Sequence, residues 1–260
     1  MVSKQPQWVL ATDIDNTLTG DEPALRQLAQ ELGALRQKGE LFLILSTGRR
    51  LEDVLSGFER EGLPEPDAII SQVGTEIYLP PFSPGMAPLA AWEERLQQRF
   101  ARNRALNFLE AVEGVAMQPD EFNTPLKVSV YLDQAPDPHA AAERVLRRIE
   151  SADDGGEYRV LWSSGRDLDI IPEAAGKGNA IRYLLKHLEL DPNKLVVAGD
   201  SGNDLSMFET FPCGIVVANA QPELDILRGD TQSDHFFATA KCAGGVTEGL
   251  RHFGLIEDQN

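Results

Sequence analysis

The sequence has few of the features that mark exported, membrane-spanning or nucleic-acid-binding proteins. Its 260 residues include two cysteines, Cys213 and Cys242, too few for a disulfide framework and typical of a reduced, cytoplasmic setting. No apolar run approaches the roughly 20 residues that cross a bilayer, and the stretch MVSKQPQWVL lacks the apolar core of a signal peptide. The formal net charge of −17 argues against nucleic acid and anionic membranes as partners. A small anionic substrate is still allowed, because salt screens charges beyond about 10 Å.

The order of apolar segments predicts an α/β protein with a mainly parallel sheet. Strand-like runs such as WVLATDID, LFLILSTGR and KLVVAGD alternate with amphipathic, helix-like stretches. The proline-rich segment PPFSPGMAP then interrupts this alternation. The chain beyond it is typical of a small α+β unit that begins with one long helix over residues 89–112. We therefore expect a main domain made of residues 1–83 and 174–260, with residues 84–173 inserted as a second, smaller domain.

Four polar clusters follow strands or open helices, where open α/β sheets bind ligands. Asp13 and Asp15 end the first strand, and Lys177 lies between two glycines at a helix start. The other two clusters are STGR at residues 46–49 and GDSGND at residues 199–204. Taken singly, each cluster is also typical of an ordinary solvated turn.

The four clusters together favour a site for phosphate chemistry. Asp13, Asp15, Asp200 and Asp204 need a counter-charge if they lie side by side, and Mg²⁺ with oxygen ligands supplies one. Lys177 in the first turn of a helix costs about 0.3–1 kcal/mol unless an anion compensates. With Thr47 and backbone amides, it would bind an anion beside the metal, as in phosphoryl transfer.

The same clusters, in this order, resemble the four motifs of the haloacid dehalogenase (HAD) superfamily of aspartate-nucleophile phosphatases. The insert is similar to the C2-type cap of that superfamily. SQVGTEIY, LKVSVYLD, SSGRDLDIIP, GKGNA and VVANAQPEL extend the resemblance to the sucrose-phosphate phosphatases across nearly the whole chain. The resemblance implies a Rossmann-like core with a parallel sheet and an inserted α+β cap.

It also implies roles for the motif residues. Asp13 would attack phosphorus, and Asp15 would protonate the leaving sugar and then activate water. Lys177 would offset charge on Asp13 and hold phosphate. The remaining phosphate-binding positions are Thr47, Gly48, Arg49 and Asn203. The Mg²⁺ ligands would be Asp13, the Asp15 carbonyl oxygen, Asp200 and Asp204.

Sugar specificity is expected from the cap, because the core motifs contact the phosphate alone. The candidate sugar-binding residues are Lys127, Ser164, Gly165, Arg166 and Asp167. Ser129 and Asp169 are weaker candidates, and Gln72 and Glu76 flank the entrance between core and cap. An ordinary cap strand with one solvated face would show the same alternation as KVSVYLD.

The resulting hypothesis is Mg²⁺-dependent hydrolysis of sucrose 6-phosphate by a cytoplasmic monomer. Phosphates of mannosylfructose, glucosylglycerol or glucosylglycerate are alternative substrates. A phosphomutase and a non-catalytic sugar-phosphate-binding module are alternatives of other classes. The synthase that supplies the sugar phosphate is a candidate protein partner.

Overall fold

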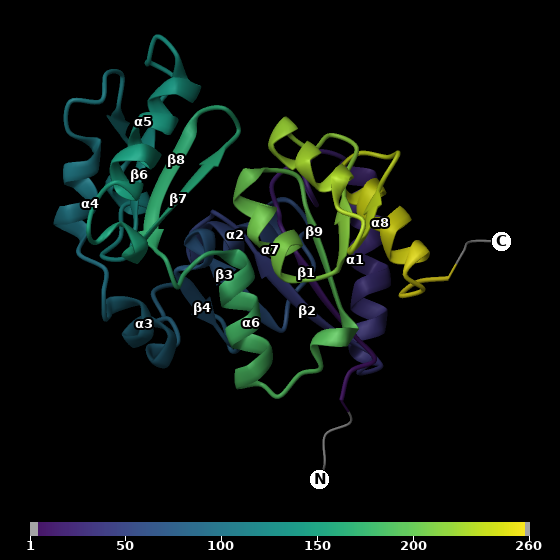
Figure 1. The fold of residues 1–260 in the computed structure, drawn as a ribbon. Helices are drawn as coiled ribbons and strands as arrows, with labels where there is room; N and C mark the ends of the chain where they lie inside the picture. Colours follow the sequence, from purple (N-terminus) through teal and green to yellow (C-terminus); the bar gives the residue numbers. More distant parts are fainter. Residues whose placement is uncertain (1–4, 258–260) are drawn as a thin grey trace.

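A computed structural model describes residues 5–257, in which a large sheet and a small sheet each carry helices (Figure 1). The large sheet has the order β11-β10-β9-β1-β2-β3-β4, and only the β3–β4 pair is antiparallel. Its strands are β1 Trp8–Thr12, β2 Leu41–Ser46, β3 Ala68–Ser71, β4 Glu76–Tyr78, β9 Leu195–Gly199, β10 Cys213–Val216 and β11 Asp234–Phe237. The expected α/β fold with a mainly parallel sheet is therefore confirmed.

Helices cover both faces of this sheet, which explains why its strands are continuously apolar. Leu10 and Leu43 point to one cluster, whereas Val9 and Ile44 point to the other. The first face is covered by α1 Glu22–Gln37, α2 Leu51–Arg60 and α8 Cys242–His252. The second face is covered by α3 Ala90–Gln97, α6 Lys177–His187 and α7 Leu205–Thr210.

The small sheet is antiparallel, with the order β5-β6-β8-β7, and lies wholly within the expected insert. Its strands are β5 Ala116–Met117, β6 Val128–Tyr131, β7 Tyr158–Ser163 and β8 Asp167–Pro172. Val128 and Val130 pack against α4 Arg102–Leu109 and α5 Pro138–Glu150 on one face. Lys127 and Ser129 alternate with these valines, so they point away from the helices. We call this unit the cap and the rest of the described chain the core.

The prediction of one long helix over residues 89–112 is wrong. The chain forms α3 and α4 instead, separated by residues 98–101. Trp92 and Leu96 of α3 belong to the cluster under the large sheet, whereas Phe108 of α4 belongs to the cap cluster. Because the two halves of this segment pack into different cores, the chain does not continue as one helix. The break lies where Phe100 packs against both clusters.

Two short elements of the core, η1 Gln72–Gly74 and η5 Gly202–Asp204, contact the cap. Gln72 donates its side-chain amide to the Glu121 carbonyl oxygen at 3.2 Å. A Cβ atom on Gly202 would lie 2.1 Å from the Trp162 carbonyl oxygen of β7, so a glycine is required for this approach. Within residues 5–257, no helix combines the length and the apolar character that a membrane span requires.

We expect Trp92 to contribute strongly to the packing of α3 on the core. Its side chain is 1% exposed, and its Nε1–H donates to the Gly74 carbonyl oxygen at 3.2 Å. Trp92→Ala should lower the free energy of unfolding in urea by about 3–5 kcal/mol. Leu146→Ala, at a side chain that is 42% exposed, is the control and should change it by about 0.5 kcal/mol or less. Equal losses of unfolding free energy in the two variants would contradict the packing of α3 on the core.

Candidate active site

The sequence clusters converge because three of them follow neighbouring parallel strands. β9, β1 and β2 are adjacent, with Thr12 paired to both Ala198 and Leu45. Asp13, Thr47 and Asp200 therefore leave the sheet at the same edge. The N-terminus of α6 brings Lys177 to this edge, and η5 brings Asp204. Gly178 allows this helix to approach, since a Cβ atom there would lie 2.1 Å from the Ser206 carbonyl oxygen.

Lys177 lies at the centre of this group as a fully buried ammonium. Its Nζ donates to Asp13 Oδ1 and to Asp204 Oδ1, both at 2.6 Å. Burial alone would lower the pKa of Lys177, but the two carboxylates raise it above that of a free lysine. Burial raises the pKa of Asp13, although Lys177 opposes the shift. The ammonium is thus the charge that makes a buried Asp13 carboxylate tolerable.

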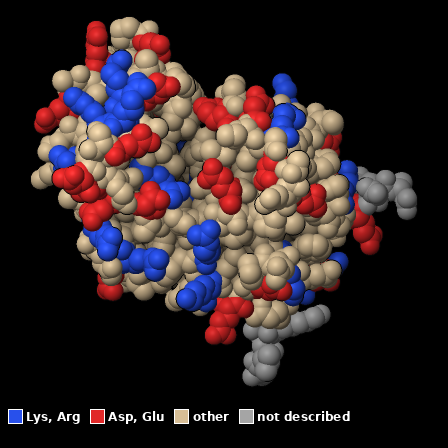
Figure 2. Space-filling view, in the orientation of Figure 1, with Lys and Arg blue, Asp and Glu red and all other residues tan. Residues whose placement is uncertain are grey.

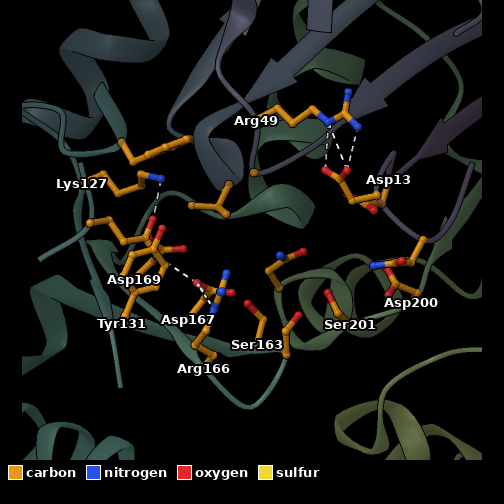
Figure 3. A pocket seen from close by; sticks show the side chains of 18 residues that line it. Asp13, Arg49, Lys127, Tyr131, Ser163, Arg166, Asp167, Asp169, Asp200 and Ser201 are labelled. Carbon is orange, nitrogen blue, oxygen red and sulfur yellow. Dashed lines mark hydrogen bonds and ion pairs between the residues drawn. The ribbon is translucent and has the colours of Figure 1, made fainter. Parts of the chain in front are cut away.

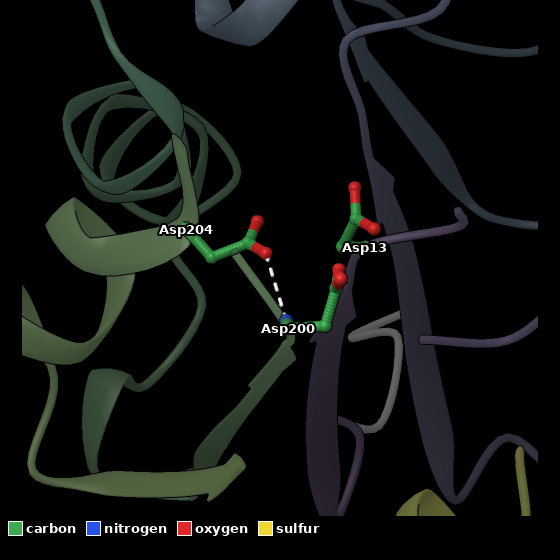
Figure 4. A group of neighbouring side chains, drawn as sticks. All are labelled: Asp13, Asp200 and Asp204. Carbon is green, nitrogen blue, oxygen red and sulfur yellow. Dashed lines mark hydrogen bonds between the residues drawn. The ribbon is translucent and has the colours of Figure 1, made fainter. Parts of the chain in front are cut away.

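Asp13, Asp200 and Asp204 point toward one another, with carboxylate oxygens within 4.8 Å (Figure 4). Burial and the charge of Asp204 raise the pKa of Asp200 to about 7. Crowded, buried carboxylate oxygens are the donor set that a hard divalent cation prefers, so these residues fit Mg²⁺.

The hydrogen bonds of Asp204 distinguish it from the other two carboxylates. Its Oδ1 faces Lys177, while its Oδ2 accepts from the backbone N–H groups of Asp200 and Ser201 at 3.0 and 3.1 Å. Thr17 Oγ1 donates to Asp200 Oδ1 at 3.1 Å, which leaves Asp200 Oδ2 outside that bond. Asp13 and Asp200 are therefore better placed as metal ligands, and Asp204 holds the Asp200 loop and Lys177 in place.

Asp15 turns away from this group and pairs with Arg49. Arg49 Nη2 donates to Asp15 Oδ1 at 2.7 Å, and Nε donates to Asp15 Oδ2 at 3.0 Å. The adjacent edge of the guanidinium, formed by Nη1 and Nη2, donates to both carboxylate oxygens of Glu61 at 2.8 Å. Burial alone would lower the pKa of Arg49, but the hydrogen bonds to Asp15 and Glu61 raise it, so Arg49 stays charged. In this arrangement Arg49 binds two carboxylates, and Glu61 is a neighbour that the sequence analysis missed.

A cavity of about 590 Å³ connects these residues with the polar face of the cap. Figure 3 shows Asp13, Arg49 and Asp200 of the core across the cavity from Lys127, Arg166 and Asp167 of the cap. Asp15, Gly48, Asn203 and Ser164 also line it, whereas Thr47, Lys177, Asp204 and Gly165 do not.

Thr47 and Gly165, which do not line the cavity, lie close to residues that do. Thr47 is buried, and its hydroxyl oxygen accepts from the Arg49 backbone N–H at 3.1 Å. Its hydroxyl hydrogen remains for an acceptor in the site. Gly165 has a φ of +62° beside Ser164 at +57°; the two are central in a turn closed by the Arg166 N–H and the Ser163 carbonyl oxygen at 3.2 Å, within the connection of residues 164–166 between β7 and β8.

Lys127 and Asp169 form a buried polar pair on the cap sheet. Lys127 Nζ lies 3.7 Å from Asp169 Oδ1, and the Ser129 hydroxyl donates to the same carboxylate oxygen. Asp167 accepts from Gln118 Nε2 at 3.1 Å and lies 3.4 Å from Arg166 Nε. Gln72 reaches the cap through Glu121, whereas Glu76 accepts from Ser71 and Tyr78 within the core.

Seven further residues line the cavity that the sequence analysis did not identify. They are Asn16, Val73, Gln118, Phe122, Tyr131, Ser163 and Ser201. Tyr131 could have been found, because it shares the period-two face of Lys127 and Ser129. Gln118 and Phe122 lie in an irregular segment around η2 Asp120–Phe122, where no periodic pattern points to the cavity.

Charge over the surface does not mark the site. On the face shown in Figure 2, acidic and basic side chains are interspersed, with Lys and Arg prominent over the cap. The two cationic side chains of the candidate site are enclosed, since Lys177 is fully buried and the Arg49 side chain is 17% exposed.

Known proteins are similar to this protein over nearly the whole chain. A profile of the sucrose-6F-phosphate phosphohydrolase family matches residues 6–254. The mannosylfructose-phosphate phosphatase of Agrobacterium fabrum is 37% identical over 255 residues, which cover 96% of this chain and 98% of that protein. Sucrose-phosphatase 1 of Nicotiana tabacum is 31% identical over 95% of this chain, and the match spans 59% of the tobacco protein.

Among solved structures, the sucrose-phosphatase of Synechocystis sp. PCC6803 in complex with sucrose and phosphate superimposes with a TM-score of 0.86. The two proteins are 32% identical, and the match covers 95% of this chain and 98% of that chain. The similarity therefore includes both core and cap.

Magnesium should stabilise the protein in a pH-dependent way. Because the folded pKa of Asp200, about 7, exceeds the ordinary 3.8, this group makes the metal-free fold less stable as pH rises from about 4 to about 7. Mg²⁺ competes with the proton, so its stabilisation should be small at pH 5 and reach about 2.7 kcal/mol at pH 8 with Mg²⁺ at 100 times Kd. Thermal melts with Mg²⁺ or EDTA measure this. A pH-independent Mg²⁺ effect, or an unchanged effect in Asp200→Asn, would contradict it.

Proposed function

Because the chain belongs to the sucrose-6F-phosphate phosphohydrolase family, we propose that it hydrolyses sucrose 6-phosphate to sucrose and phosphate. One observation carries the proposal: Asp13, which is paired with the buried Lys177, lies at one end of a cavity whose other end is a polar cap surface. The volume of about 590 Å³ falls in the range of about 300–1,000 Å³ typical of small-molecule sites. The core end would bind the phosphate and the cap end the disaccharide.

In the first step, an Asp13 carboxylate oxygen forms a bond to phosphorus while the bond between phosphorus and the sugar oxygen breaks. Asp15 gives its proton to that sugar oxygen. In the second step, water passes a proton to Asp15 and its oxygen forms a bond to phosphorus while the bond between phosphorus and the Asp13 oxygen breaks, so phosphate leaves and both aspartates return to their starting states. Arg49 holds the Asp15 carboxylate for these transfers.

The remaining core residues would bind and neutralise the phosphate. Lys177 would favour the ionised form of Asp13, and the Thr47 hydroxyl and the Gly48 backbone would donate to phosphate oxygens. Asp13, Asp200 and the Asp15 carbonyl oxygen would hold Mg²⁺, with Asp204 behind them. When bound, Mg²⁺ would neutralise charge that develops on the transferring phosphate.

We also propose that residues 84–173 act as the specificity cap on a core of residues 1–83 and 174–260, of which 1–4 and 258–260 lie outside the described residues. Lys127, Ser164, Arg166 and Asp167 would bind sugar hydroxyls. The proposal includes a cytoplasmic monomer that receives its substrate from a sugar-phosphate synthase.

A second candidate substrate is mannosylfructose phosphate, favoured by the 37% identity to the Agrobacterium fabrum enzyme over 98% of its length. Glucose and mannose differ only in the configuration at C2, so the two disaccharides present nearly the same shape. Discrimination would then depend on a few hydrogen bonds in the cap, each worth roughly 1–3 kcal/mol when a buried group is left unpaired.

Substrate profiling tests the choice of sugar. We expect kcat/KM for sucrose 6-phosphate to exceed that for hexose phosphates by about 100-fold, because the cap groups stay unpaired with a monosaccharide. The panel includes mannosylfructose phosphate and glucosylglycerol phosphate, each with Mg²⁺ and with EDTA. Turnover of sucrose 6-phosphate no faster than that of hexose phosphates would refute the proposal. A higher kcat/KM for mannosylfructose phosphate would select the second candidate.

Asp13→Asn tests the nucleophile. The amide keeps the shape of the side chain but cannot form the acyl phosphate, so kcat should fall by about 10³-fold or more. Thermal stability in EDTA should not decrease, because the substitution removes a buried carboxylate whose pKa burial has raised. Turnover at the unsubstituted rate would rule out covalent catalysis by Asp13.

A further inference from the structure

We propose that Glu61 is a positioning residue for the reaction, which holds Arg49 on Asp15 and away from the phosphate. The inference rests on the proposed function, in which Asp15 transfers the proton. Glu61 belongs to none of the four sequence clusters and follows α2, twelve residues beyond Arg49. Its part in the site is visible only in the contacts of the folded chain.

The guanidinium of Arg49 is shared between two carboxylates. Its Nε–Nη2 edge faces Asp15, and its Nη1–Nη2 edge faces Glu61, with both Glu61 oxygens at 2.8 Å. Such paired, charge-assisted hydrogen bonds fix the plane of a guanidinium as well as its position. Because Nη2 donates to both carboxylates, fixing the Glu61 edge also fixes the direction in which Asp15 is held.

Helix α2 is built to allow this contact. A Cβ atom on Gly57 would lie 3.3 Å from Arg49 Nη1 and 2.6 Å from Leu63 Cδ1, so the glycine leaves room for the guanidinium. Glu61 caps the helix, with its backbone N–H donating to the Gly57 carbonyl oxygen at 3.0 Å. The backbone from which the Glu61 side chain extends is therefore fixed.

Arg49 needs such an anchor because its other available partner is the phosphate. Arg49 lines the cavity beside Asp13, and a guanidinium binds a phosphate with the same two-pronged geometry that it uses for a carboxylate. The Asp15 side chain is 53% exposed, so water weakens its hold on Arg49. Without Glu61, Arg49 can move to the phosphate, and its hydrogen bonds then no longer hold Asp15 in position.

Glu61→Gln in the Mg²⁺-loaded full chain tests this inference, with p-nitrophenyl phosphate and sucrose 6-phosphate as substrates. We expect kcat to fall by about 10- to 100-fold on both substrates, since a misplaced proton donor slows the chemical step. KM should stay the same or fall. Inorganic phosphate should inhibit about 2- to 5-fold more tightly, because the released Arg49 joins the phosphate site.

Glu59→Gln is the matched control, since it removes the same charge from an exposed position on the same helix. It should leave kcat and phosphate inhibition unchanged. Glu61→Asp, whose carboxylate is one methylene shorter, should lie between Glu61→Gln and the parent protein. Tighter phosphate inhibition is the decisive result, because a general loss of structure would weaken phosphate binding.

Two outcomes would overturn the role of Glu61: an unchanged kcat in Glu61→Gln, or a lower kcat with weaker phosphate inhibition and a lower melting temperature. Both are separable from failure of the proposed function. If the parent protein turns over p-nitrophenyl phosphate but not sucrose 6-phosphate, the sugar assignment fails, and the Glu61 test still proceeds on the aryl ester. If the parent protein hydrolyses neither ester, the chemistry fails and the role of Glu61 with it.

Discussion

The site depends on one buried ion group, the ammonium of Lys177 between Asp13 and Asp204. An unpaired charge in a protein interior costs several kcal/mol, so neither the lysine nor the carboxylates would be stable there alone. The surrounding backbone is shaped to bring them together. Gly178 lets α6 approach Ser206, and Gly199 leaves room for the Asp204 side chain, whose Cβ would lie 2.6 Å from an added Cβ. Gly178 and Gly199 are thus required by the packing that forms the ion group.

The charges around the cavity explain why a divalent cation fits. Five carboxylates, those of Asp13, Asp15, Asp200, Asp204 and Glu61, face two cations, Lys177 and Arg49, which leaves an excess of three negative charges when all are ionised. A phosphate monoester would add further negative charge. Protonation is one way to relieve the excess, and the raised pKa values of Asp13 and Asp200 favour it. A divalent cation held by Asp13 and Asp200 would be the other, and it would supply the missing positive charge without protonating Asp13.

The sequence predicted the core well because strand ends are predictable from apolar runs. Once β1, β2 and β9 are placed in one parallel sheet, Asp13, Thr47 and Asp200 must meet at its carboxyl edge. Side-chain partners were less predictable: nothing in the spacing of Arg49 and Glu61 indicates that the two are hydrogen-bonded. The cap was predicted least completely. Strand β6, beside the cavity, shows a clear alternation, but Gln118 and Phe122 lie in an irregular segment that only the fold brings to the cavity. The broken helix at residues 98–101 has the same origin, since the two cores that divide it are far apart in sequence.

Contacts between the core and the cap include two beside the cavity, one made by the side chain of Gln72 and one by Gly202. Gln72, with a φ of +50°, precedes Gly74 and binds the cap carbonyl of Glu121. Gly202, between Asp200 and Asp204, lies against the Trp162 carbonyl oxygen. Because η5 also carries Asp204, the segment that packs against β7 is the one whose carboxylate accepts from Lys177 and from the Asp200 backbone. The packing of the cap on the core and the arrangement of the charges at the carboxyl edge of the sheet therefore depend on the same glycine-containing segment.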